Sequence, residues 1–489
     1  MIPRIVISSL SSAAGKTTVT AGLCELLRGR GMRVAALKAG PDFIDPLFHE
    51  QVVGALRGNI DLYFTGEEEA RRIFCDDTRG ADVAVVEGAM GLFDGVGGNT
   101  ARASAFHVAR ALGSSVLLVV DAKKKSLSAA AEIAGALALS EKLSGDFPAR
   151  GPLRFFALLN RCSAPLFARL KPKIEELCGV PVVGFLESDG AFSVASRHLG
   201  LVTPDAVLGV KEKIAAIARS LQRNLDVGLL FGQGGFPAPG ERPRPGRTEP
   251  PCSPPPFRRV TGIAVARDEA FCFYYRENLA LLERFGAELL FFSPLRNEPV
   301  PREARALYIG GGYPELFWRE LSEAARAAAS VRAVCRSGLP VFAECGGFLY
   351  LKLLGVLAGT FRDEGRLVRF GYAEFECREN NFLLRKGEKI RGHEFHHFDT
   401  SENGRAFIAR KPGPLGAEWE CVQLSSAVDA AEKPCRLKSA AFGKNIVAGF
   451  PHFYFPSNPV VAERLVDAAL VYDSLFGDCA PCRRAREGP

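Results

Sequence analysis

The chain has 489 residues, of which 47% are hydrophobic and 24% charged, and a formal net charge of +7. This length excludes a single ordinary core, so we expect two or more domains. The composition excludes a disordered chain, and no apolar run reaches the roughly 20 residues that a membrane-spanning helix needs. The mild positive charge, without a dense Lys/Arg block, fits a small anionic substrate at least as well as nucleic acid.

The cysteine pattern indicates reduced thiols. The thirteen cysteines are odd in number and lie scattered through apolar segments. The N-terminus lacks a basic segment followed by an apolar stretch and a small-residue cleavage site, so we expect a cytoplasmic protein. One close pair, Cys479 and Cys482, stands in a polar tail. A metal or redox role there lacks a second pair to complete the site.

A proline-rich segment divides the chain. Residues 237–256 read "PAPGERPRPGRTEPPCSPPP", which neither a helix nor a central strand tolerates. We expect a first domain over 1–227, a linker over 228–258 and a second domain over 259–489.

Both halves alternate short apolar runs with helical stretches. Continuous apolar runs are typical of strands covered on both faces, so we expect a mostly parallel α/β sheet in each half, that is, two doubly wound domains. The predicted strands are 4–10, 33–38, 82–88, 115–122, 154–160 and 180–186 in the first half, and 261–267, 288–293, 306–312 and 339–347 in the second.

The first predicted strand leads into "SSLSSAAGKTT", residues 8–18. Gly15, Lys16, Thr17 and Thr18 then precede a helical run, which is the order of a phosphate-binding loop. Backbone N–H groups would bind phosphate, Lys16 would reach the β/γ-phosphates, and Thr17 would offer a hydroxyl to Mg²⁺. Leu10 stands where the usual pattern has a glycine. The alternative is a Ser/Gly turn that caps a helix.

Two further stretches supply carboxylates beside this loop. "KAGPDFIDP" carries Asp42 and Asp45, and "VVEGAMGLFDG" carries Glu87 and Asp94. In a doubly wound sheet, ligands bind outside the carboxyl ends of the strands, where both stretches fall. Carboxylates that face phosphates repel them unless a metal lies between, so we interpret Asp45, Glu87 and Asp94, with Thr17, as Mg²⁺ ligands. The alternative is that each Asp caps a turn.

In the second half, "PVFAECGGFLYL" places Cys345 between a strand and a helix. Such a turn exposes a nucleophile, and a helix N-terminus favours thiolate. Gly346 and two glycines of "YIGGGYPEL", Gly311 and Gly312, are candidates for an oxyanion hole. A buried structural cysteine and an ordinary strand-end turn are the alternatives.

A nucleophilic thiol needs a base, and His452 of "GFPHFYFPSNP" is our candidate. A second group of histidines, His393, His396 and His397, lies in "RGHEFHHF". A strand would put His393 and His397 on one face and His396 on the other, so we expect a substrate or interdomain contact there rather than a metal site.

Ordered motifs carry a family resemblance over most of the chain. The first half resembles the N-terminal domain of cobyrinic acid a,c-diamide synthases, which are dethiobiotin-synthetase-like P-loop enzymes, and the second half resembles their class I glutamine amidotransferase domain. The motifs are "SSAAGKTTVTAGL", "VAALKAGPDFIDPLFH", "VVEGAMGLFDG", "SRHLGLV", "GIAVARDEAFCFYYRENLALLE", "FFSPL", "GGGYPE" and "RGHEFHHF".

The sequence departs from the family pattern at two positions. Ala13 replaces a glycine, and Phe43 replaces a tyrosine. Class I enzymes commonly have Glu two residues after the histidine, whereas Tyr454 stands there in this chain. The diamide synthase branch also lacks this Glu, so the resemblance implies a Cys345–His452 dyad.

The resemblance implies ATP- and Mg²⁺-dependent amidation of the a and c acetate groups of cobyrinate. An acyl phosphate would be the intermediate, and glutamine would supply the ammonia. Asp42, Asp45, Arg197 and His198 are the candidates for substrate contact, although Arg197 and His198 also suit a solvated helix end. The partners would be small molecules, with neither nucleic acid nor membrane, and a homodimer is the assembly to test.

Two other functions remain open from the residues. The first is the same chemistry on another tetrapyrrole, such as sirohydrochlorin, its nickel complex or sirohaem. The second is a P-loop regulatory ATPase with an inactive amidotransferase module. Such ATPases usually carry an additional lysine early in the loop, and residues 8–15 contain none.

Overall fold

The computed structural model describes residues 2–147, 153–188, 204–231, 260–413, 416–426 and 444–476. The chain forms two compact units, Met1–Pro251 and Cys252–Pro489, which are taken in turn below. The candidate residues Arg197, His198, Cys479 and Cys482 lie outside the described residues.

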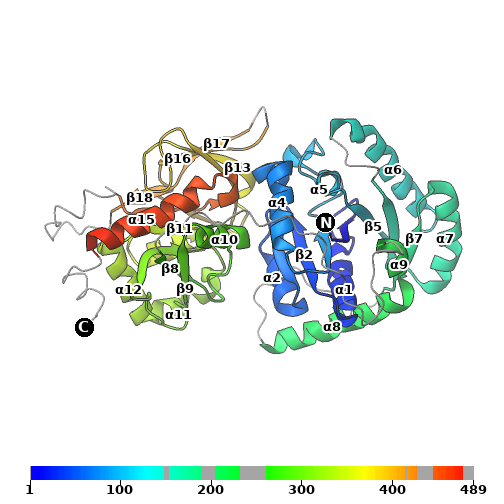
Figure 1. Ribbon diagram of the computed structural model, residues 1–489, viewed down its shortest axis with the longest axis horizontal. Coiled ribbons are helices and arrows are strands. Elements are labelled where there is room, and N and C mark those ends of the chain that lie inside the picture. The colour runs from blue at the N-terminus through cyan, green and yellow to red at the C-terminus, as the bar shows by residue number, and fades with distance from the viewer. Residues whose placement is uncertain are drawn as a thin grey trace. The chain divides into compact units, whose positions relative to one another are not determined.

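The first unit contains a seven-stranded sheet in which every neighbouring pair is parallel. The strand order is β3-β2-β4-β1-β5-β6-β7, so β1 is the central strand. Strands β2, β5 and β7 of this sheet are labelled in Figure 1. Because β1, β2 and β4 are neighbours and run the same way, the loops that follow them meet at one edge of the sheet. The strands are β1 (Arg4–Ser8), β2 (Val34–Ala39), β3 (Leu56–Ile60), β4 (Val83–Glu87), β5 (Ser115–Asp121), β6 (Phe155–Asn160) and β7 (Val182–Leu186).

Helices cover this sheet. One apolar core joins sheet residues such as Ile5 and Val85 to α1 and α8, which pack side by side. The helices are α1 (Lys16–Gly29), α2 (Ile44–Phe48), the π-helix η1 (His49–Val53), α3 (Leu62–Thr65), α4 (Glu67–Asp77), the 3₁₀ turn η2 (Val96–Gly98), α5 (Ala105–Leu112), α6 (Ser128–Leu143), the 3₁₀ turn η3 (Ser144–Asp146), α7 (Ala164–Cys178), α8 (Pro204–Asn224) and α9 (Val227–Phe231).

The second unit is built on a six-stranded sheet of order β18-β19-β11-β10-β8-β9. All neighbours are parallel except β18, which runs antiparallel to β19. The strands are β8 (Thr261–Ala266), β9 (Ala287–Phe292), β10 (Ala304–Ile309), β11 (Val341–Glu344), β18 (Gln423–Ser425) and β19 (Ile446–Gly449).

Two apolar cores cover the two faces of this sheet. One core joins it to α10, α15 and an antiparallel sheet, and the other joins it mainly to α12 and α13. The helices are α10 (Arg276–Arg284), the 3₁₀ turn η5 (Pro314–Phe317), α11 (Trp318–Glu323), α12 (Ala325–Arg336), α13 (Gly346–Leu353), the 3₁₀ turn η6 (Phe455–Ser457) and α15 (Val460–Phe476).

A five-stranded antiparallel sheet of order β17-β16-β13-β14-β20 adds to the second unit a layer that the sequence did not predict. Its last member, β20, has only two residues and pairs with β14 through Gly392–Phe453 and His393–His452. The strands are β13 (Arg369–Cys377), β14 (Lys389–His396), β16 (Phe407–Arg410), β17 (Glu418–Cys421) and β20 (His452–Phe453), and a separate pair joins β12 (Phe361–Asp363) to β15 (Phe398–Thr400).

The predicted α/β class is confirmed for both units. Within the described part of the chain, no helix has the length and apolar character needed to cross a bilayer.

Candidate active sites

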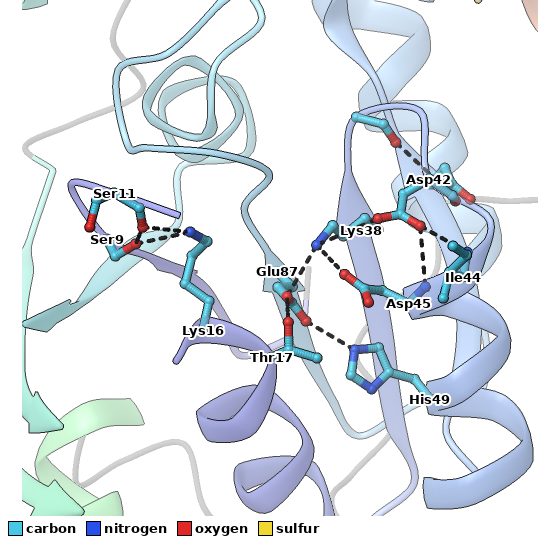
Figure 2. A network of polar contacts seen from close by, with 12 residues as sticks. Ser9, Ser11, Lys16, Thr17, Lys38, Asp42, Ile44, Asp45, His49 and Glu87 are labelled. Atoms are coloured by element: carbon cyan, nitrogen blue, oxygen red, sulfur yellow. Dashed lines mark hydrogen bonds and ion pairs between the residues drawn. The ribbon is translucent and has the colours of Figure 1, made fainter. Parts of the chain in front are cut away.

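The loop after β1 is shaped by two residues with positive φ, Ala13 at 63° and Gly15 at 97°. Gly15 ends the loop, and α1 begins at Lys16, so Lys16, Thr17 and Thr18 occupy the first turn of the helix. The Lys16 ammonium folds back over the loop, where it donates to Ser9 Oγ at 2.9 Å and to the Ser11 carbonyl at 3.2 Å (Figure 2). Burial and the charge of Lys38 lower the pKa of Lys16. The loop thus presents a cation at the N-terminus of a helix, as phosphate binding requires.

Asn160, the last residue of β6, and Arg161, the residue after it, support this loop, and the sequence analysis missed both. Asn160 Nδ2 donates to the Ala14 carbonyl at 2.8 Å, and the Arg161 guanidinium donates to the Ala13 carbonyl at 3.0 Å. A Cβ on Gly15 would lie 2.1 Å from Asn160 Nδ2, so only glycine allows this approach. The signal in the sequence that could have identified this support is a polar residue, Asn160, at the end of an apolar run.

Glu87 is the centre of a buried network beside the loop (Figure 2). Its side chain is fully buried at the end of β4. Oε1 accepts hydrogen bonds from Thr17 Oγ1 at 2.6 Å and from Lys38 Nζ at 3.1 Å, and Oε2 lies 3.1 Å from His49 Nε2. One carboxylate therefore connects α1, β2 and the π-helix η1.

Lys38 holds the carboxylates of this network together. Its ammonium donates to Asp45 and Glu87 and lies 3.9 Å from Asp42 Oδ2. Burial opposes its charge, but Glu87, Asp45 and Asp42 outweigh burial and raise its pKa. Burial and the charge of Glu87 raise the pKa of Asp45 to about 7. Glu87 is also buried, yet Lys38, His49 and Thr17 hold its pKa below the usual value.

The structure brings Thr17, Asp45 and Glu87 of the predicted set together. Asp42 also caps a turn, because its Oδ1 accepts from the Ile44 and Asp45 N–H groups at 2.8 and 3.2 Å. Asp94 closes a neighbouring turn by accepting from the Gly91 N–H at 2.8 Å. Its charge offsets part of the lowering of the Lys16 pKa.

The sequence analysis missed Lys38 and His49. Each is a charged or titratable residue next to an apolar stretch, which is the signal that could have identified them.

The donor set has the chemistry that Mg²⁺ requires. Hydroxyl and carboxylate oxygens converge from Thr17, Glu87 and Asp45, and Mg²⁺ is commonly held by one or two carboxylates together with phosphates and water. Within the described ranges, no cluster of three or more His, Cys, Asp or Glu residues forms a ready-made metal site. The residues present fit a metal that a nucleotide would help to bind.

A pocket of about 640 Å³ lies at the ends of β5, β6 and β7. Its lining includes three consecutive lysines, Lys123, Lys124 and Lys125, together with Arg161 and Glu187. Arg161 also contacts the phosphate-binding loop, so the pocket adjoins that loop on the same edge of the sheet. Lys125 pairs with Glu132 and Arg161 pairs with Asp121 at 2.6 Å, so these two carboxylates, together with Glu187, offset part of the positive charge of the pocket.

In the second unit, Cys345 occupies the sharp turn between β11 and α13. Its backbone adopts φ 47° and ψ −104°, a strained conformation for a residue other than glycine. The Cys345 N–H donates to the Gly449 carbonyl at 2.8 Å, which anchors the turn to β19. This geometry matches that of a nucleophile raised out of a sheet.

Gly311 brings Cys345 and His452 to one place. A Cβ on Gly311 would lie 3.4 Å from Cys345 Cβ, 3.3 Å from His452 Nε2 and 2.4 Å from His452 Cε1. A Cβ on Gly346 would lie 3.2 Å from the Gly312 nitrogen, so the two candidate N–H donors are close to each other. The structure therefore collects the predicted thiol, base and oxyanion glycines around one point.

Burial dominates the electrostatics of this pair. It raises the pKa of the Cys345 thiol, which the Glu315 charge raises further and the Gly346 N–H lowers. Burial, with His393 and His396, holds the pKa of His452 well below its usual value. The helix N-terminus does favour the thiolate, since the Gly346 N–H lowers the pKa of Cys345, but desolvation outweighs this effect. Both shifts favour the neutral thiol and the neutral imidazole.

His393 is the neighbour of His452 on β14. The two rings stack at 4.9 Å with 16° between their planes, and Tyr275 Oη lies 3.0 Å from His393 Nδ1. His396 instead contacts Glu394 Oε2 at 3.2 Å and stacks on Phe450. His393 thus contacts the proposed base, whereas His396 contacts Glu394 and Phe450.

Comparison with known proteins matches nearly the whole chain. Residues 5–201 match the CobQ/CobB/MinD/ParA nucleotide binding domain, and residues 262–459 match the CobB/CobQ-like glutamine amidotransferase domain. The cobyrinate a,c-diamide synthase of Thermoplasma volcanium is 34% identical over 96% of this chain and 98% of its own length. That of Clostridium tetani is 38% identical over 87% of this chain and 95% of its own length.

Solved structures match single units. The MinD cell division protein of Aquifex aeolicus covers 45% of this chain and 96% of its own, with 16% identity and a TM-score of 0.29. A PurLQS structure from Thermotoga maritima covers 44% of this chain and 99% of its own, with 18% identity and a TM-score of 0.29.

Proposed function

The chain belongs to the cobyrinate a,c-diamide synthase family, and from this premise we propose that it amidates the a and c acetate carboxylates of cobyrinate with ATP and glutamine. The observation that carries the proposal is the presence of two chemically distinct sites in one chain. One unit holds the loop with Lys16 and the Glu87 network, and the other holds Cys345 and His452 around Gly311.

The first unit activates the substrate. A carboxylate oxygen is too poor a leaving group for direct attack by ammonia, so the carboxylate oxygen attacks the γ-phosphorus of ATP, and ADP leaves. Ammonia then attacks the acyl carbon of the resulting acyl phosphate, inorganic phosphate leaves, and the nitrogen loses a proton to give the amide. Lys16 and the N-terminus of α1 bind the phosphate oxygens and stabilise the charge of the transfer.

Thr17, Asp45 and Glu87 would hold Mg²⁺, and Asp94 is the further candidate from the adjacent loop. When bound, the metal supplies positive charge to the phosphate oxygens. Lys38 keeps Asp45 and Glu87 within one cluster despite their like charges. Asp42, Arg197 and His198 remain our proposals for contact with the tetrapyrrole.

The second unit releases the ammonia. Cys345 Sγ attacks the side-chain amide carbon of glutamine while its proton passes to His452. His452 returns the proton to the departing nitrogen, so that ammonia leaves and a thioester remains. Water, deprotonated by His452, then attacks the thioester and frees glutamate and the thiol. The N–H groups of Gly311, Gly312 and Gly346 are the proposed oxyanion donors.

The substrate is tested by mass spectrometry after incubation of the protein with ATP, glutamine and single tetrapyrrole acids. Cobyrinate should gain two amides, whereas sirohydrochlorin, its nickel complex and sirohaem should gain none. Amidation of another tetrapyrrole, with cobyrinate unchanged, would contradict the substrate. A protein that releases no ammonia from glutamine would contradict the whole function and favour the regulatory ATPase.

Two variants separate the sites. Cys345→Ser should abolish the use of glutamine and leave amidation with ammonium salts, because the activation site is in the other unit. Lys16→Ala should abolish ATP-dependent amidation and spare glutamine hydrolysis, and Lys173→Ala, on the exposed face of α7, is the matched control. Loss of both activities in Cys345→Ser would contradict two separate sites.

The remaining partners follow from the same proposal. They are glutamine, ATP and the tetrapyrrole polycarboxylate, with a cytoplasmic location and a homodimer as the assembly. Sedimentation of the purified protein tests the homodimer.

A further inference from the structure

The base of the glutamine site lies on a segment that has little backbone support of its own. β20 contains only His452 and Phe453, and it pairs with β14 at only two positions. Tyr454 stands where class I enzymes commonly place the carboxylate that orients the histidine. One further backbone bond joins the Tyr454 N–H to the Arg391 carbonyl of β14 at 3.0 Å, and side chains from neighbouring elements complete the support of this segment.

We propose that Glu344, supported by Tyr308 and Asn278, is the positioning residue that sets His452 against Cys345. Glu344 immediately precedes the nucleophile, and its side chain reaches the residue that immediately follows the base. This inference rests on the proposed glutamine hydrolysis, and it assigns a positioning role within that same site.

The hydrogen bonds of Glu344 connect the two strands directly. Oε1 accepts from the Phe453 N–H at 2.7 Å, and Oε2 accepts from Tyr308 Oη at 2.7 Å. Its exposed fraction is 2%, so water does not compete for these bonds. Any movement of the Glu344 carboxyl is thus transmitted to the Phe453 peptide and, through it, to His452.

Asn278 of α10 holds the same segment through other atoms. Its Nδ2 donates to the Phe453 carbonyl at 2.8 Å, and its Oδ1 accepts from the Phe455 N–H at 2.8 Å. Asn278 is completely buried. Both the N–H and the carbonyl of Phe453 are therefore fixed by buried side chains, one of which belongs to the residue next to the nucleophile.

The surroundings of Glu344 indicate that it acts as a hydrogen-bond partner rather than as a charge. Tyr308 stacks on Phe342 at 5.1 Å, and Phe342 stacks on Phe453 at 5.8 Å. Burial in this aromatic environment raises the pKa of Glu344 to about 8. A neutral carboxyl at neutral pH is therefore replaceable by an amide of the same length, but not by a shorter carboxylate.

Two substitutions of Glu344 test this. Glu344→Gln keeps an oxygen within reach of the Phe453 N–H and an amide group for Tyr308. Glu344→Asp keeps the carboxylate but withdraws it by one methylene. We expect Glu344→Asp to lower kcat for ammonia release about 100-fold, the size of effect produced by a misplacement of about 1 Å, with little change in KM. Glu344→Gln should stay within about 3-fold of the unmodified protein, by the same reasoning.

The controls separate positioning from general damage. Asn445→Leu removes two buried hydrogen bonds, to the Cys335 and Leu339 carbonyls at 3.0 and 2.8 Å, at the opposite end of β19. It should lower the unfolding temperature without lowering kcat. Amidation with ammonium salts should be unchanged in every variant, because it does not use this site.

Three results would overturn the inference. They are a kcat of Glu344→Asp equal to that of the unmodified protein, equal losses of kcat in the Asp and Gln variants, and an equal loss of kcat in Asn445→Leu. If Glu344→Asp does not fold, Tyr308→Phe takes its place, because it frees the Glu344 carboxyl on one side only. We expect a lowered kcat at unchanged KM in that variant, and an unmodified kcat would overturn the inference. If the unmodified protein releases no ammonia, the proposed function fails instead.

Discussion

Thr17 Oγ1 donates a 2.6 Å hydrogen bond to Glu87 Oε1, which joins the first turn of α1 to the carboxyl end of β4. The same carboxylate accepts from Lys38 and lies within hydrogen-bond distance of His49. The residue proposed for the metal and the helix proposed for the phosphates are thus in direct contact. A substitution of Glu87 should therefore affect activation and leave glutamine hydrolysis unchanged.

Glu87→Gln should lower ATP-dependent amidation with ammonium salts at least 100-fold and raise the Mg²⁺ concentration that gives half-maximal rate. The amide keeps the shape of the side chain but leaves Lys38 without one of its two closest compensating charges, which costs several kcal/mol for a buried pair. Amidation measured against Mg²⁺ concentration checks this. Glutamine hydrolysis is the internal control, and an unaltered Mg²⁺ titration would exclude Glu87 as a ligand.

Two substitutions in the phosphate-binding loop should have different effects on the free energy of unfolding. Ala13 has φ 63°, and a non-glycine residue in this region is strained by about 1–2 kcal/mol. Ala13→Gly removes the strain but increases the freedom of the unfolded chain, which costs about 0.4–1 kcal/mol. We expect the free energy of unfolding to stay the same or rise by up to about 1.6 kcal/mol, by this balance.

Gly15→Ala is the matched counterpart. Its Cβ would lie 2.1 Å from Asn160 Nδ2 at a φ of 97°, so both the loop and its support must move. We expect a loss of about 2 kcal/mol or more in urea unfolding, together with loss of nucleotide binding. Equal effects of the two substitutions would show that the described loop geometry does not govern this region.

The elements that the sequence predicted well are those with a strong local pattern. The buried strands of the parallel sheets are continuous apolar runs, and Lys16 and Cys345 follow such strands in turns that contain glycine. The antiparallel sheet was missed, because strands with one exposed face give a weak pattern. Strand β3 contains Arg57 and Asn59, so it lacks the apolar run that identified its neighbours.

The missed site residues depend on contacts between distant parts of the chain. Lys38 and Glu87 meet only because β2 and β4 are neighbours in the sheet. Glu344 and Phe453 lie 109 residues apart in the chain, yet they share a hydrogen bond. Sequence spacing carries no information on such pairs. The raised pKa of the Cys345 thiol could not be predicted for a related reason, since burial is a property of the fold.

The raised pKa of Cys345 predicts its reactivity in the free protein. The thiolate is the reactive form, and burial disfavours it, so alkylation by iodoacetamide should remain slow near pH 7 and continue to rise above pH 9. Cys75 is exposed and serves as the reference within the same molecule. Peptide mapping at several pH values measures both. A rate for Cys345 that reaches a plateau below pH 8 would contradict a buried, neutral thiol.

Glu344 predicts a pH dependence of stability in the second unit. Its pKa is about 8 in the folded protein and 4.5 in the unfolded reference state, so the folded state binds its proton more tightly. The resulting stabilisation is fully present below pH 4.5 and is lost as the pH rises through 8, at most about 1.4 kcal/mol for each unit of pKa difference.

Glu344→Gln cannot lose a proton from this position, so it should lack that part of the pH dependence. Urea unfolding of both proteins at pH 5, 6.5 and 8 measures the difference in free energy. The unmodified protein should lose stability relative to the Gln variant with each step upward in pH, because ionisation leaves a charge among Tyr308, Phe342 and Phe453. A difference that stays constant, or that grows in favour of the unmodified protein, would mean that the carboxyl is already ionised at neutral pH and that Glu344 holds the Phe453 N–H as an anion.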